Sequence, residues 1–115
     1  MAIQSTAILS ADTTIFTCPG LATTDAREYA VTCIIFCNSA EIDITLTVHY
    51  VPANEPKSFR NMVVNGLTIP AGETFTFDTE KIILSTGDRV QAIASVGPDD
   101  IGKGVNAIIS TLRVS

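Results

Sequence analysis

The sequence predicts an all-β protein, a single-domain antiparallel β-sandwich of about eight strands with jelly-roll or immunoglobulin-like connections and little or no helix. Thr, Val and Ile are frequent, and Gly, Pro, Asn and Asp interrupt them at short intervals, which is typical of strands and turns. Apolar and polar residues alternate at period two, most regularly from Glu41 to Val51. The chain has 115 residues and 12.2 kDa, which fits one domain spanning 1–115 around one core.

The first third of the chain predicts an extended start and two strands. Residues 1–12 could form an extended N-terminal arm, and the β-branched run from Thr13 to Thr17 predicts the first strand. From Glu28 to Cys37 apolar residues fall on both faces, with Tyr29, Val31, Cys33 and Ile35 on one face and Ala30, Ile34 and Phe36 on the other. Such a strand is either central in its sheet or covered on its outer face by a partner subunit.

The clearest strand runs from Glu41 to Val51. Its predicted inward residues are Ile42, Ile44, Leu46, Val48 and Tyr50, and its predicted water-facing residues include Asp43, Thr45, Thr47 and His49. Because Asn38-Ser39-Ala40 is a short turn, we expect this strand to pair with the preceding one as an antiparallel hairpin.

The second half of the chain alternates loops with short strands. Two prolines make Pro52 to Lys57 a loop. The stretch from Ser58 to Val64 could be a short helical turn or an irregular edge, and Asn65-Gly66 could be a hairpin turn. The turn Thr86-Gly87-Asp88 is expected to pair the strands on its two sides. The strands expected here are Leu67 to Ile69, Glu73 to Phe77 with Phe75 and Phe77 on one face, Lys81 to Leu84, Arg89 to Val96, and Val105 to Val114.

Charge and hydropathy exclude several kinds of partner. The net charge is −5 and no Lys/Arg cluster occurs, so nucleic-acid binding is not expected. The start Met1 to Thr6 resembles no secretion signal, and no run of about eighteen apolar residues occurs. We therefore expect a soluble protein that begins near Met1, is made in a cytosol and binds no membrane.

The sequence shows no pattern of catalytic, cofactor-binding or metal-binding residues. His49 is the one histidine and is expected to be solvated or at an interface. No nucleophile motif, phosphate loop or zinc motif is present. Asp99 and Asp100 lie in the loop Gly97 to Gly102 without the alternating spacing of a calcium loop, so this loop is interpreted as a solvated turn. The sequence therefore predicts no enzyme.

The three cysteines, Cys18, Cys33 and Cys37, are interpreted as unpaired, small, buried residues. Cys33 and Cys37 share a strand face but lie roughly 13 Å apart at about 3.3 Å per residue, which is too far for a disulfide.

The apolar content is high for a small soluble domain. Hydrophobic residues make up 46% and charged residues 17%, and the mean hydropathy is +0.35. Two strands carry apolar residues on both faces, and a sandwich has only one interior, so a second face must meet a loop, another subunit or a larger assembly. The residues predicted for such an interface are Ile34, Phe36, Ile108, Leu112 and Val114. We expect a small homo-oligomer, with a trimer favoured.

Several segments, spread along most of the chain from Thr13 to Ser95, resemble a family of small virion structural proteins of tailed bacteriophages. These segments are Thr13 to Pro19, Ile34 to Ser39, Thr45 to Pro52, Leu67 to Thr74, Ile83 to Val90 and Ala92 to Ser95.

The resemblance implies a compact β-sandwich on a particle surface without catalytic residues. It implies a capsid decoration or cement protein on the exterior of the assembled head, bound to the major capsid protein or another virion protein and assembled in the bacterial cytoplasm. One alternative is an accessory protein of the neck, tail or baseplate. A second is a carbohydrate-binding receptor module, which the lack of Trp and the core positions expected for most of the seven aromatic residues disfavour.

Overall fold

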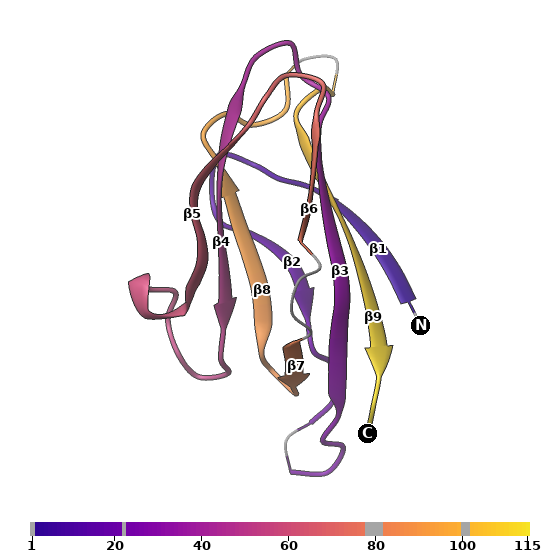
Figure 1. The fold of residues 1–115 in the computed structure, drawn as a ribbon. Helices are drawn as coiled ribbons and strands as arrows, with labels where there is room; N and C mark the ends of the chain where they lie inside the picture. The colour runs from indigo at the N-terminus through magenta and orange to yellow at the C-terminus, as the bar shows by residue number, and fades with distance from the viewer. Residues whose placement is uncertain (1, 22, 78–81, 100–101) are drawn as a thin grey trace.

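A computed structural model describes residues 2–21, 23–77, 82–99 and 102–115. Within these residues, nine strands and one short 3-10 helix form two antiparallel sheets that pack face to face (Figure 1). The prediction of an all-β antiparallel sandwich is therefore confirmed. The elements are β1 (Ala2–Ala7), β2 (Thr13–Thr17), β3 (Glu28–Asn38), β4 (Ile44–Val51), η1 (Phe59–Asn61), β5 (Met62–Ile69), β6 (Thr74–Phe77), β7 (Ile82–Ser85), β8 (Arg89–Ala94) and β9 (Val105–Arg113).

Strands that follow one another in the sequence mostly lie in different sheets. Sheet A has the order β1-β9-β3-β6, and β7 also pairs with β3; sheet B has the order β2-β8-β4-β5. Residues 1–12, predicted as an extended arm, contain β1, which is paired along β9 at the edge of sheet A. Among the described strands, β4 and β5 are the one pair of sequence neighbours joined as a hairpin.

The predicted hairpin of β3 with β4 is wrong, because the two strands belong to different sheets. Asn38, fully buried at the end of β3, redirects the chain. Its Nδ2 donates to the carbonyl oxygens of Ile42 and Ile69, each at 2.9 Å, and its Oδ1 accepts from the Ala40 backbone N–H at 3.0 Å. These bonds satisfy a buried amide and fix a crossing from sheet A to sheet B.

The predicted pairing of β7 with β8 is also wrong, since β7 lies in sheet A and β8 in sheet B. The turn between them is held by the Asp88 carboxylate, which accepts from the backbone N–H groups of Ser85 at 2.9 Å and Ala53 at 2.8 Å. Gly87 has φ +92°, and a Cβ there would lie 2.9 Å from the Ala53 Cβ. The expected turn exists, but it connects the two layers.

The core fills the space between the sheets. Ile44, Leu46 and Val48 point inward from β4 as predicted, whereas Ile42 lies in the crossing before β4 and is largely exposed. Phe75 and Phe77 of β6 both pack against the core, as expected from their shared face. The largest fully buried side chains include Phe36, Ile8, Ile34, Ile44, Leu46, Ile69 and Ile109.

For the stretch from Ser58 to Val64 the sequence left two alternatives, a short helical turn or an irregular edge. It contains η1, which is capped by the Ser58 side chain and followed directly by β5. The helical-turn alternative is therefore correct. Asn65-Gly66 forms no hairpin turn, because β5 continues through it. Gly66 adopts φ +67° within the shift of the β4–β5 register that separates the pairs Leu46–Leu67 and Val48–Val64. Glycine adopts this conformation without a Cβ penalty, which allows a bulge inside the strand.

Candidate functional site

The candidate functional site is the outer surface of sheet A, which we call the apolar face. Strand register and burial define its members, because residues directly opposite one another project to the same side of a sheet. Ile35 lies opposite Ile108, and Ala30 lies opposite both Leu112 and Ile83. The outward residues are Ile3, Ser5 and Ala7 of β1, Asn106, Ile108, Ser110 and Leu112 of β9, Ala30, Cys33, Ile35 and Cys37 of β3, Thr74 and Thr76 of β6, and Ile83 of β7.

A β-bulge in β3 decides which apolar residues reach this face. The register with β9 shifts between Val31 and Cys33, and both Val31 and Ile34 lie in the core. One extra residue reverses the alternation, so Ile34 and Phe36 point inward and Cys33 and Ile35 point outward. The assignment of Ile34 and Phe36 to an interface is therefore corrected, because both side chains are fully buried within this chain.

The other predicted interface residues are at the surface. Ile108 and Leu112 lie on the apolar face with 37% and 42% of their surface exposed. Val114 follows β9 and is 47% exposed, and its backbone N–H donates to the Glu28 carbonyl oxygen at 2.9 Å. Two exposed members were not predicted, Ile3 at 70% and Ile83 at 51%. The alternation in these two short strands involves too few residues to show which face is solvated.

The apolar face has a corrugated profile along the strands. Ile108 and Ile35 lie side by side and form one bulky row. The next row contains the small pair Ser110 and Cys33. The row after that places Leu112 and Ile83 on either side of Ala30, whose own surface is buried.

Charge is confined to the margins of the apolar face. None of the residues that define it is an Asp, Glu, Lys or Arg, although the chain has twelve Asp and Glu and seven Lys and Arg. Glu28 lies at the far end of β3, and its carboxylate accepts from the Ser115 hydroxyl at 3.0 Å. Protein–protein interfaces are depleted of charged residues at their centres, and this face has that composition.

The predicted solvated position of His49 is wrong. His49 lies on the outer side of sheet B but is buried, and its Nδ1 has no hydrogen-bond partner among the described residues. Burial lowers the pKa of His49 from 6.5, the Lys57 charge lowers it further, and the Asp12 charge opposes this. Lys57 and Asp12 form an ion pair with each other. The polar alternation of β4 is correct, but the chain that follows β4 covers its last residues.

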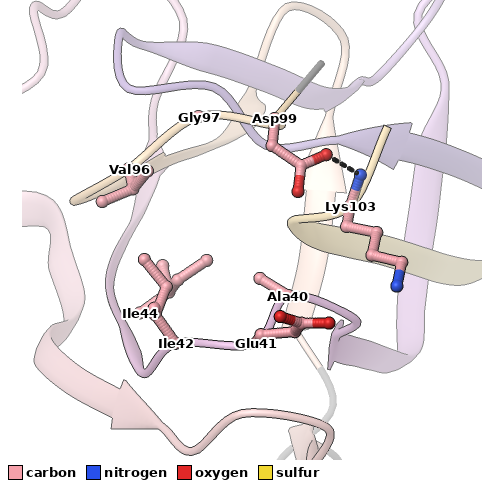
Figure 2. Close-up of a pocket in the computed structure, with 8 residues that line it drawn as sticks. All are labelled: Ala40, Glu41, Ile42, Ile44, Val96, Gly97, Asp99 and Lys103. Carbon is pink, nitrogen blue, oxygen red and sulfur yellow. Dashed lines mark hydrogen bonds between the residues drawn. The ribbon is translucent and has the colours of Figure 1, made fainter. Parts of the chain in front are cut away.

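A hollow of about 290 Å³ lies at the end of the sandwich where the connections before β4 and after β8 meet (Figure 2). Ile42, Ile44 and Val96 form its apolar side, and Glu41, Asp99 and Lys103 lie around the rest. The Lys103 backbone N–H donates to the Asp99 carboxylate at 2.8 Å, which closes the loop on itself. Asp100, the second carboxylate of the loop considered for calcium, lies outside the described residues, and the described part of the chain contains no cluster of three metal-ligating side chains.

The three cysteines are free. Cys33 and Cys37 lie on one side of β3, as predicted, and both are half-buried on the apolar face. Cys18 is buried, and its Sγ donates to the Leu84 carbonyl oxygen at 3.4 Å. Burial raises the pKa of the Cys18 thiol, and the Asp88 charge raises it further.

Most aromatic rings are unavailable as a sugar-stacking platform. Phe16 and Phe36 are buried, and Tyr29, Tyr50, Phe75 and Phe77 pack against the core, as expected. Phe59 in η1 is 83% exposed and was not predicted, since a single aromatic residue in an irregular stretch gives no periodic signal.

Comparison with known proteins finds no family model, no curated protein and no solved structure that matches the chain. Within the described residues no helix is long and apolar enough to span a membrane. Inference about function therefore depends on the surfaces described above and on the resemblance seen in the sequence.

Proposed function

We propose that this protein is a non-enzymatic structural protein of a bacteriophage particle that works by binding other protein subunits. The observation that carries the proposal is the apolar face, a contiguous, uncharged sheet surface with several exposed aliphatic side chains. Monomeric soluble proteins rarely expose such a contiguous patch unless a partner covers it.

Within that class, we propose a capsid decoration or cement protein on the exterior of the assembled head. It would act as a small homo-oligomer that contacts the major capsid protein or another virion protein, and it would be assembled in the cytoplasm of the bacterial host. The segment resemblance favours a phage particle, and the acidic net charge of −5 suits an exterior position better than one beside packaged DNA. Burial of apolar surface across capsid-protein junctions would stabilise the assembled state by mass action.

The corresponding experiment is stoichiometry on intact particles. Virions purified from the phage that encodes the chain are analysed by mass spectrometry for its presence and by gel densitometry for its copies relative to the major capsid protein. A copy number close to that of the major capsid protein supports decoration of the head. A few copies per particle would place the protein in the neck, tail or baseplate, and its absence from purified particles would contradict the proposal.

A further inference from the structure

We infer that the apolar face binds a second copy of this chain, with the same face of two protomers packed together about a two-fold axis. The inference deepens the proposed function, because it depends on this face being a protein-binding surface and names the partner. Three observations carry it: the distribution of exposed apolar residues, the area of the face and its profile.

The first observation concerns where the exposed apolar residues lie. Four of them, Ile3, Ile83, Ile108 and Leu112, gather on the apolar face. Outside it, Ile42 and Val96 line the small hollow, and the other exposed large apolar residues of the described chain are scattered over loops, edges and the helical turn, as Leu21 and Phe59 show. A ring with a different contact on each side needs a second, complementary apolar surface, whereas a two-fold pair needs one surface that fits itself.

The second observation is the size of the face. With strands about 4.8 Å apart and a rise of about 3.3 Å per residue, four neighbouring strands over the length of β9 cover about 600 Å². Packing two such faces would bury about 1,200 Å² in total, which is at the lower end of the range for specific, stable interfaces. Because the face is uncharged, two acidic copies could meet there without placing like charges opposite one another.

The third observation is the order of the rows. On β9 and β3 the bulky pair Ile108 and Ile35 lies next to the small pair Ser110 and Cys33, and on β1 the order is reversed, with Ser5 beside Ile108 and Ile3 beside Ser110. A two-fold axis in the plane of the interface, running across the strands midway between these rows, exchanges them. The bulky row of each protomer then packs into the small row of the other, and the same contact forms twice.

The test uses the purified full-length chain. Sedimentation equilibrium at micromolar concentration is expected to give twice the mass of the monomer. Ile108→Asp should weaken the dimer by at least about tenfold, because a carboxylate would be buried against apolar rows without a partner. Val63→Asp is the matched control, since Val63 is exposed to a similar degree, 40% against 37% for Ile108, but lies on β5 in sheet B. It should leave the dimer unchanged.

A second variant avoids adding charge. Ser110→Phe should fill the small row and dissociate the dimer by steric overlap, with the fold checked by circular dichroism. Cys33 provides an independent measurement, because its thiol should be alkylated more slowly in the wild-type dimer than in Ile108→Asp, as mass spectrometry of the modified peptide would show.

Each remaining outcome has a defined meaning. A wild-type monomer at tens of micromolar, or a dimer that is lost in Val63→Asp and retained in Ile108→Asp, would overturn the inference. A trimer would overturn the two-fold arrangement. In all of these cases, presence of the protein in purified particles would leave the proposed function standing. If the protein forms the dimer but is absent from particles, the inference stands and the proposed function is contradicted.

Discussion

The outer surfaces of the two sheets differ although the same chain builds both. The surface of sheet A exposes three isoleucines and a leucine and carries charge only at its margin, with no part of the described chain lying across these four side chains. The surface of sheet B is rich in threonine, and its side chains bond to one another and to the backbone. Thr47 Oγ1 accepts from the Gly66 N–H at 3.2 Å, and Gln91 Nε2 donates to Thr14 Oγ1 at 3.2 Å.

At one end, sheet B is also covered by its own chain. His49 and Val51 project outward from β4 and yet are buried. The segment 52–61 returns beside them, held by the Lys57–Asp12 ion pair and by a bond from Arg89 Nη2 to the Glu55 carbonyl oxygen at 3.0 Å. The comparison teaches that buried outward residues at this end of sheet B are covered by the same chain, whereas the isoleucines and leucine on the outside of sheet A stay exposed in the described structure.

The largest expected effect tests the inside and outside of sheet B. Leu46→Ala should lower the free energy of unfolding by about 2–5 kcal/mol, because a fully buried side chain is lost and a cavity remains. Thr47→Ala, on the outer surface one residue later, should cost less than about 1 kcal/mol. Urea denaturation measures both, and equal losses would show that the assigned register of β4 is wrong.

An intermediate effect compares the covered end of sheet B with the uncovered sheet A. Val51→Ala should cost about 2 kcal/mol, since Val51 is 1% exposed and the substitution removes its buried methyl groups. Ile83→Ala, on the half-exposed apolar face, should cost less than about 1 kcal/mol when measured below the concentration of self-association. A larger loss of stability for Ile83→Ala than for Val51→Ala would show that the assignment of Ile83 as exposed and Val51 as buried is wrong.

The smallest effect is the pH dependence arising from His49. Its pKa in the folded state is lowered from 6.5, so between the two values the unfolded chain binds more protons than the folded one. The free energy of unfolding should therefore decrease as the pH falls below about 6.5 and be fully retained above it. His49→Gln should flatten this part of the profile in denaturant melts at pH 5 and pH 7.5. An unchanged profile in this variant would show that other groups carry the dependence.

Most of the strands were predictable from the sequence because alternation, Thr and Val content and turn residues act locally. The inward-pointing residues of β4 and the shared face of Phe75 and Phe77 were predicted from that signal. The β1 strand was missed as a paired strand, since Ala2–Ala7 has weak strand propensity and gains its partner only from β9, far along the chain.

The errors share a physical cause, which is that local signals do not report tertiary partners. Turn residues around Asn38 and Gly87 mark a reversal, but the same residues suit a hairpin within a sheet or a crossing between sheets. The bulge at Val31/Cys33 adds one residue that no composition rule reveals, and it exchanges the two faces of β3. Two of the five residues predicted for the interface, Ile34 and Phe36, therefore lie on the inner side of sheet A.

The position of β9 has a consequence for how the chain acquires its structure. β9, at residues 105–113, lies between β1 and β3 and pairs with both, so residues near the start of the chain have no strand partner until this late segment arrives. Loop-closure entropy over such separations must be overcome before any pairing energy is gained, which favours slow folding in a single concerted step. On the ribosome, β1 would have no strand partner and β3 would lack β9 through nearly the whole of synthesis, exposing aliphatic edges to neighbouring chains. Any delay in releasing the last segment would then prolong this exposure and favour aggregation.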